Sequence, residues 1–427
     1  MNKAVFLRKR VFSWALYDWA NSAYATVVMA VFFPFFLRAY WSPETDAAVT
    51  TYRLGMAGGT ASLIVAMLAP VLGAIADRGG ARKKFLTVFA GLGIVMTGGL
   101  YFVQMGAWPV AVALYIAATI GFSGANVFYD SLLVDVSPED KLDTVSAYGF
   151  SLGYLGGGLM YAFILLLVRK PEVFGIGGPQ EAVRLGFALV ALWWAVFSLP
   201  LLLFVHQRGE GQGEPLTLAV RNGIAQLVHT FAEIRALRSV LFLLAAYWLY
   251  IDGVHTVVIM AVDFGLSVGL EIEDLGLAIL ITQFVGFPAT LAFGWLGSRL
   301  GAKVGIFLGL AVYIAAVVSA AFLSSAQGFY ALAVIIGLVQ GGVQSLSRSL
   351  YARLIPTDKA GEFFGFYNML GKFAAVMGPF LYGWVSLVTG STRAGIFSIV
   401  VLFVLGAGML SLVSEKSGRS SAAALAG

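Results

Sequence analysis

The segment GAIADRGGARK (residues 73–83) recurs in altered form as GWLGSRLGAK (residues 294–303), about half a chain later. Both copies follow a long apolar segment, and both keep glycines and basic residues at the same spacing. Asp77 of the first copy stands where the second has Ser298. Because repeats separated by a constant distance relate whole structural units, the two halves of the chain are expected to share one topology.

The composition predicts that both halves lie in a membrane. Hydrophobic residues make up 59% of the 427 residues and charged residues 11%, whereas soluble domains carry about 25% charged residues. A span needs about 20 mostly apolar residues, and it must be helical because lipid offers no partner to backbone N–H and C=O groups. The predicted spans are 12–37, 54–76, 85–105, 108–133, 147–168, 184–205, 239–262, 275–297, 304–324, 329–350, 363–388 and 394–413.

A second pair of segments supports the duplication. Residues 126–141 align with residues 344–359, and serine, leucine, proline, aspartate and lysine recur at equivalent positions. Asp130 in the first copy aligns with Arg348 in the second, so the charge is opposite although the spacing of the residues is the same. An even number of spans separates the copies, which predicts two parallel halves related by an axis along the membrane normal.

The longest polar stretch inside the chain, residues 207–238, separates these halves. It begins with closely spaced glycines and a proline and continues as an amphipathic run at 216–234. This composition predicts a linker that carries a surface helix. The expected domains are therefore 1–206 and 239–427, each with six spans.

Lysine and arginine are distributed unevenly between the two sides of the predicted spans. With the N-terminus inside, most of them fall on cytoplasmic segments. The opposite side receives Arg38, Arg53, Arg169, Lys170, Arg184 and Arg393. Because positively charged loops stay in the cytoplasm, both termini are expected there. The same bias accounts for the net charge of +5 without nucleic acid as a partner.

Four further motifs carry a family resemblance. They are WALYDWANSAY (14–24), YIDGV (250–254), QGGVQSLSRS (340–349) and EFFGFYN (362–368), the last followed by Gly371-Lys372. Together they resemble the vacuole-effluxer-like family, the autophagy-related amino acid effluxers, and they look like a bacterial-type member. Residues 73–83 resemble the cytoplasmic loop signature of the major facilitator superfamily, with Ala81 as a departure before the basic pair.

The resemblance implies a fold and a class of substrate. The major facilitator fold has twelve transmembrane helices in two pseudo-symmetric six-helix halves, and its first, fourth, seventh and tenth spans line a central cavity. Fungal members of the family are linked to amino-acid efflux from the vacuole. The chain is therefore expected to be an all-α polytopic membrane protein that moves amino acids or similar solutes.

Polar residues form one stripe on each of the four spans that the resemblance assigns to the cavity. Positions three, four, seven or eight apart share a helix face, and charged residues inside a span mark functional sites by default. The alternative for any single polar residue is a hydrogen bond between helices. The candidates for substrate or coupling sites are Asp18, Asn21, Tyr24, Asn126, Asp252, His255, Gln340, Gln344, Asn368 and Lys372.

Asp252 is the candidate for coupling to protons. It lies near the middle of span seven, with His255 one turn away. A carboxyl group that is protonated facing one side and ionised facing the other links transport to protons. The alternative is an Asp–His pair that only braces the span. Lys372 in span eleven is expected either to attract a substrate carboxylate or to neutralise an acid such as Asp77 or Glu362.

Charges near the cytoplasmic ends of the spans predict a gate. The candidates are Asp77, Arg78, Asp130, Asp135, Arg348 and Arg353. Asp130 and Arg348 are equivalent in the two repeats, as are Asp135 and Arg353, and ion pairs among them would close the cytoplasmic side. In the alternative, each charge pairs within its own half. Asp77 would accept N–H groups at a helix end, so that its loop acts as a conformational latch.

Three function classes fit these features. The first is a secondary transporter that moves amino acids or similar polar metabolites by alternating access, coupled to protons. The second is a transporter of lipids, amphiphiles or drugs with the same fold, and the third is a membrane receptor or sensor that transports nothing. The acids, Arg348 and Lys372 inside the spans favour a polar or zwitterionic substrate over a lipid.

The sequence argues against an enzyme. It has no cysteine and three histidines, and it contains neither Gly-x-Ser-x-Gly nor His-Glu-x-x-His. Residues 365–372 resemble a phosphate loop only superficially, because the spacing and Phe373 do not fit. No cofactor and no metal site is expected. We expect a monomer in a bacterial inner membrane, with a small-molecule substrate, protons and the lipid bilayer as its partners.

Overall fold

The computed structural model describes residues 3–208, 237–267, 271–323, 325–374 and 377–425, with Leu218 and Ile234 as isolated positions. These residues form helices and connecting loops, without a β-strand among them. Within this part of the chain, 12 helical segments are long and apolar enough to cross a membrane. The predicted set of spans is therefore confirmed. The predicted linker helix at 216–234 lies largely outside the described residues.

The first half begins with a span in which α-helix and wider π-helix alternate. Its turns change from α to π at Tyr24 and again at Leu37. The elements of this half are α1 (Lys3–Ala23), η1 (Tyr24–Phe32), α2 (Phe33–Phe36), η2 (Leu37–Trp41), α3 (Ala47–Arg78), α4 (Arg82–Gly99), η3 (Leu100–Phe102), α5 (Trp108–Ser131), α6 (Leu133–Val136), η4 (Glu139–Lys141), α7 (Leu142–Arg169), η5 (Pro171–Phe174) and α8 (Pro179–Phe204).

The second half repeats this order and adds a short helix after its last span. Its elements are α10 (Arg238–Ser267), α11 (Ile272–Leu300), α12 (Ala302–Ala320), α13 (Ala326–Leu354), η6 (Thr357–Lys359), α14 (Ala360–Phe373), α15 (Met377–Thr389), α16 (Thr392–Ser398), α17 (Val400–Ser411) and α18 (Glu415–Leu425).

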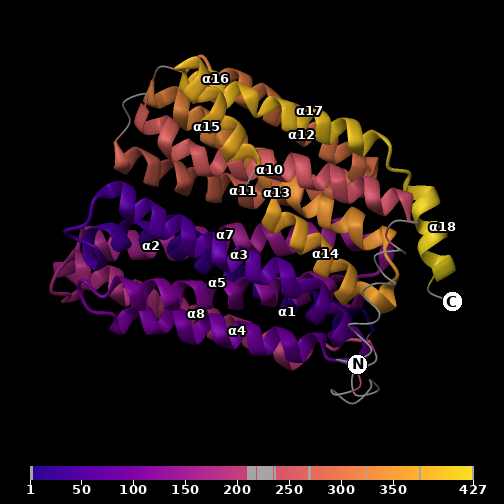
Figure 1. The fold of residues 1–427 in the computed structure, drawn as a ribbon. Coiled ribbons are helices and arrows are strands. Elements are labelled where there is room, and N and C mark those ends of the chain that lie inside the picture. The colour runs from indigo at the N-terminus through magenta and orange to yellow at the C-terminus, as the bar shows by residue number, and fades with distance from the viewer. Residues whose placement is uncertain are drawn as a thin grey trace.

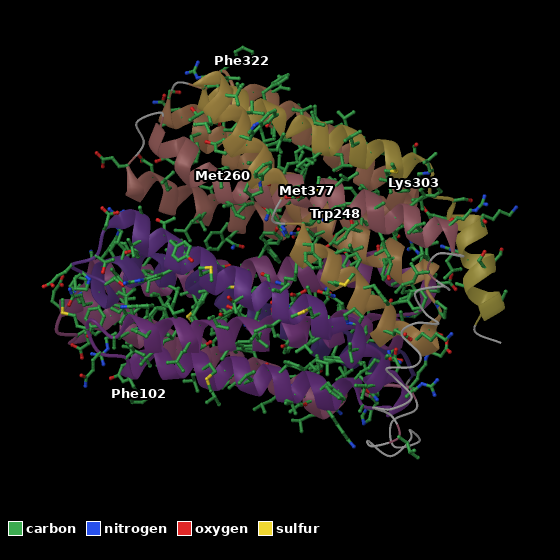
Figure 2. All side chains as sticks on the ribbon, in the orientation of Figure 1. Phe102, Trp248, Met260, Lys303, Phe322 and Met377 are labelled. Carbon is green, nitrogen blue, oxygen red and sulfur yellow. The ribbon has the colours of Figure 1, made fainter. Side chains whose placement is uncertain are left out.

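The two halves lie side by side as separate bundles, indigo to magenta for the first and pink to yellow for the second (Figure 1). Both ends of the chain lie at the same end of the molecule, here called the termini end (Figure 1). Lys303, at the start of α12, lies toward that end as well (Figure 2). The two pseudo-symmetric halves are therefore present, whereas the domain limits at 206 and 239 stay a prediction.

Two helix pairs make the most extensive contacts between the halves: α3 packs against α14, and α7 packs against α11. The repeat exchanges these pairs, since α3 corresponds to α11 and α7 corresponds to α14. The α3–α14 crossing is close because glycines face each other. A side chain at Gly73 would collide with the carbonyl of Gly361 and with the backbone of Glu362. The segment 73–83 is thus placed in the contact between the halves.

Span eleven differs from the single helix predicted at 363–388. α14 ends at Phe373, and α15 begins anew at Met377. The two pieces pack on different neighbours, α14 on α3 and α5, α15 on α10 and α16. A proline is tolerated in the first turn of a helix but not in its interior, and Pro379 lies in the first turn of α15. Gly378-Pro379 was the sequence signal for this break.

Candidate functional site

A cavity of about 360 Å³ lies between the halves. All four spans predicted to line it contribute side chains, and α7, α11 and α14 add more. Of the predicted site residues, Asp18, Asn21, Asn126, Asp130, His255, Gln344, Arg348, Asn368 and Lys372 line it. These nine residues come from five helices, four of which are the spans with the predicted polar stripes. Tyr24, Gln340 and Asp252 do not line this cavity.

The side of the cavity that belongs to the first half is formed by side chains of α1 and α5, which are joined by hydrogen bonds. The Asn21 side chain donates to the Asn126 side chain at 2.6 Å. The Tyr129 hydroxyl donates to Asp18 Oδ2 at 3.1 Å. Tyr24 is fully buried behind this wall, where its hydroxyl pairs with Thr119. Tyr24 therefore contributes to packing within the first half.

Arg348 from α13 lies at the end of the cavity nearest the termini and reaches into the first half. Its Nη1 lies 2.9 Å from Asp130 Oδ1 and 3.7 Å from Asp18 Oδ2. Its Nε and Nη2 donate to the hydroxyl and the carbonyl of Ser146, each at 2.9 Å. The guanidinium lies 4.2 Å from the Phe150 ring centroid. We call these residues the Arg348 cluster.

The predicted ion pair between Asp130 and Arg348 is thus present in the structure. Asn368 of α14 donates to the second oxygen of Asp130 at 3.0 Å, so both carboxylate oxygens are bound from the other half. Arg348 is 2% exposed. Removing one partner of such a buried pair costs roughly 3–5 kcal/mol, because the other charge stays buried without compensation.

The prediction of an ion pair between Asp135 and Arg353 is wrong, because each residue pairs with a different partner. Asp135 pairs with Arg82 of its own half at 3.1 Å. Arg353 pairs instead with Asp143 across the boundary between the halves. The physical reason is position: Asp135 follows α5 and lies beside the start of α4, whereas Asp143 is in the first turn of α7, which packs against α13. Asp143 also accepts a hydrogen bond from the Ser349 hydroxyl.

Asp77 makes a third contact between the halves. Its two carboxylate oxygens accept N–H groups from Gly361 and Glu362 at 3.0 and 2.8 Å, at the start of α14. Arg82 Nε lies 2.9 Å from the same carboxylate. The favourable position of an acid at a helix N-terminus explains the contact. Arg78, the last residue of α3, lies next to it.

Asp252 points away from the cavity and is 1% exposed. Its oxygens accept the N–H groups of Met377 and Gly378, both at 3.0 Å, which caps α15 (Met377 is labelled in Figure 2). No hydrogen bond between Asp252 and His255 occurs in the described part of the chain. The expected Asp–His pair is absent there, and Asp252 instead fixes the helix that begins after the break in span eleven.

Replacing Asp252 with Ala is expected to lower the free energy of unfolding by about 1–3 kcal/mol, since two buried N–H groups lose their acceptor. Thermal unfolding of the purified protein in detergent would measure this. Asp252→Asn keeps one carbonyl acceptor and should lose less. His255→Ala is the matched control on the same helix, because its side chain faces the cavity. An unchanged unfolding temperature for Asp252→Ala would contradict the capping role.

Two cavity residues, Gln283 and Tyr154, and one residue of the contact between the halves, Asp143, were not predicted from the sequence. Gln283 of α11 donates to Thr26 of the first span at 2.7 Å and thereby joins the halves. The Tyr154 hydroxyl lies 3.5 Å from the Gln344 side chain. Gln283 was visible as a polar residue inside a predicted span. Asp143 lies just before the predicted start of span five, so it carried no signal as a charge within the membrane.

Comparison with known proteins gives consistent matches. The family model described as "Vacuole effluxer Atg22 like" matches residues 49–138 and 134–423. A protein of Bacillus subtilis (strain 168), "Uncharacterized MFS-type transporter YxiO", is 39% identical over 408 residues, which cover 95% of each chain. "Autophagy-related protein 22-1" of Neosartorya fischeri is 29% identical over 322 residues, which cover 69% of this chain and 52% of that protein.

The solved structures extend the comparison to the fold. The major facilitator superfamily proton:xylose symporter XylE, bound to 6-bromo-6-deoxy-D-glucose, superposes with a TM-score of 0.74. The match covers 100% of both chains at 15% sequence identity. At this identity the likeness concerns the arrangement of the helices.

Proposed function

The chain belongs to the vacuole effluxer Atg22-like family and is a transporter of the major facilitator type, and from this premise we propose that it moves amino acids, or similarly small polar solutes, in a proton-coupled cycle. The observation that carries the proposal is the cavity between the halves. It is lined by side chains of both charges and by amides from both halves. Such a lining suits a polar solute, whereas a lipid would need an apolar one.

Alternating access is supported by where the contacts between the halves lie. The Arg348 cluster, the Arg353–Asp143 pair and the Asp77 contact with α14 all lie toward the termini end of the cavity. These polar contacts can be exchanged for water when that end opens. The cavity would then be reached from each side in turn, with the two halves moving as bodies.

We place the termini end in the cytoplasm of a bacterial inner membrane, with the protein acting as a monomer. The excess of lysine and arginine on the segments at this end supports the orientation. In that orientation the structure is closed toward the cytoplasm. The limits of the halves at 206 and 239, with a linker at 207–238, are part of the same proposal.

For the coupling proton we favour Asp130 over Asp252. Asp130 lines the cavity, and its carboxylate binds Arg348 and Asn368 of the other half. Protonation would neutralise one partner of the ion pair and weaken the contact between the halves. The carboxylate of Asp252 is bound to two backbone N–H groups and faces away from the cavity. A group in that position meets neither side of the membrane.

Uptake of labelled amino acids into proteoliposomes, with and without a pH gradient, tests the proposal. We expect uptake driven by the gradient in the unaltered protein. Asp130→Asn should lose the response to the gradient but retain exchange of substrate between the two sides. Asp252→Asn should keep the response.

Loss of coupling in Asp252→Asn alone would return the coupling site to span seven. Absence of uptake for every amino acid, with folded protein confirmed by gel filtration, would reject amino acids as substrates. If exchange does not depend on pH in any variant, proton coupling is rejected, whereas transport of amino acids stands.

A further inference from the structure

The cavity contains two unlike charges, Asp18 and Lys372, that the close ion pair between Asp130 and Arg348 does not neutralise. Its ionisable lining residues other than tyrosine are Asp18, Asp130, His255, Arg348 and Lys372. Asp130 and Arg348 are 2.9 Å apart and cancel each other's charge. Asp18 lies further from the same guanidinium, at 3.7 Å. Two carboxylates therefore share one guanidinium, and the ammonium group of Lys372 has no ion pair with any residue that the structure describes.

The remaining charges come from opposite halves. Asp18 belongs to α1, and its Oδ2 accepts the hydrogen bond from Tyr129. Within the described chain, Asp18 Oδ1 has no hydrogen-bond donor. Lys372 belongs to the last turn of α14, just before the break in span eleven. Its Nζ lies 6.0 Å from the ring centroid of Phe122, a residue of the first half, so the ammonium group reaches across the cavity.

Lys372 forms neither an ion pair nor a hydrogen bond with any residue that the structure describes. An ammonium group removed from bulk water is costly unless an anion compensates it. Neither acid that was expected to neutralise Lys372 does so. Glu362 lies at the start of α14, more than two turns away, and Asp77 at the end of α3 is held by Arg82. An anion supplied by the substrate would meet this need.

We propose that the cavity binds a zwitterion, whose carboxylate is held by Lys372 and whose ammonium group is held by Asp18. The inference rests on the proposed transport of amino acids and specifies which half holds each end of the substrate. His255 lies in the same wall as Lys372 and offers a further nitrogen to the carboxylate. Because the ligand touches both halves, its binding is linked to their relative position.

The rest of the lining indicates what side chain the zwitterion carries. Phe122, Phe150, Tyr154, Tyr247 and Tyr367 supply aromatic surface between the charged groups. Aromatic rings favour apolar and aromatic groups by contact area. The site is therefore suited to neutral amino acids with apolar or aromatic side chains, and leucine and phenylalanine are the first probes.

The test compares each amino acid with two fragments that each lack one charged group. For leucine these are 3-methylbutylamine, which lacks the carboxylate, and 4-methylpentanoate, which lacks the ammonium group. Calorimetric binding to the full-length protein in nanodiscs is the measurement. The unaltered protein is expected to bind leucine at least roughly tenfold more tightly than either fragment, since each charged hydrogen bond contributes that much.

Each variant should remove one preference and keep the other. Lys372→Gln is expected to bind leucine and 3-methylbutylamine alike, and Lys372→Arg should recover part of the difference. Asp18→Asn is expected to bind leucine and 4-methylpentanoate alike. Lys84→Gln, which changes an exposed lysine outside the cavity, is the matched control and should behave as the unaltered protein.

The outcomes separate this inference from the proposed function. If amino acids bind and Lys372→Gln keeps the full preference for leucine over its amine, the zwitterion site is overturned while transport of amino acids stands. If one fragment binds as tightly as leucine to the unaltered protein, a site for a single charge replaces it. If neither amino acid binds and uptake of the whole panel fails as well, the proposed substrate class falls and this inference falls with it.

Discussion

Replacing Arg348 with Asp is expected to abolish transport, and adding Asp130→Arg is expected to restore part of it. In the single variant, the new carboxylate would face Asp130 and Asp18 at the boundary between the halves. Breaking a buried ion pair costs roughly 3–5 kcal/mol. Since each 1.4 kcal/mol is a factor of ten in an equilibrium, the population of the closed state should fall by two to three orders of magnitude.

The double variant exchanges the two charges between equivalent positions of the repeat. It restores one attractive pair across the halves, while the bonds from Arg348 to Ser146 and the stacking on Phe150 are lost. Recovery is therefore expected to be partial. Initial rates of exchange in proteoliposomes are the measurement, with the amount of folded protein determined for each variant.

Arg299→Asp provides the control for a charge reversal at an exposed arginine of α11, next to the Trp295 ring. It should transport like the unaltered protein. If the double variant is as inactive as Arg348→Asp while remaining folded, pairing between Asp130 and Arg348 is not what closes this end. Full activity of Arg348→Asp would reject the gate altogether.

Replacing Gly73 with Val is expected to hold the termini end open. The new side chain would overlap the backbone of Gly361 and Glu362, so α3 and α14 could pack only at a greater separation. That separation would also break the hydrogen bonds from Asp77 to α14. Overpacking costs about 1–3 kcal/mol, which predicts a fall in transport of about one to two orders of magnitude.

The absence of cysteine makes this prediction directly measurable. Cysteines introduced at the exposed positions Asp140 and Thr357, one in each half, can carry spin labels without background labelling. Gly73→Val should lengthen the distance between these labels. Gly59→Val lies on the same helix, where a side chain has open space, and should change neither the distance nor transport. Equal distances in both variants would show that the α3–α14 crossing does not control closure.

The cavity residues show what helix periodicity predicted correctly and what it did not. Asp18 and Asn21 share a face of α1, as Asn126 and Asp130 share a face of α5, and all four line the cavity. Asp252 was assigned to the same cavity by the same argument but turned out to cap α15. Its spacing from His255 was compatible with either direction, because residues three apart on a helix still differ in orientation by about 60°.

The ion pairs between charged residues could be predicted from the sequence only in part. The repeat correctly related Asp130 to Arg348, but the same rule related Arg353 to Asp135 instead of Asp143. A repeat specifies which positions are equivalent, and equivalence does not specify distance. The pairing of Arg353 depends on how α13 packs against α7, helices that are far apart in the chain.

The sequence by itself determined that this chain is a helical membrane protein with two equivalent halves, and its motifs indicated a transporter by resemblance. Apolar segments of spanning length can exist in lipid only as helices, and segments that recur in the same order in both halves indicate a common topology. Only the tertiary structure decided which charges meet, where span eleven breaks, and which polar residues face the cavity. Those outcomes depend on contacts between helices distant in sequence, and such contacts are set by side-chain packing that no local pattern encodes.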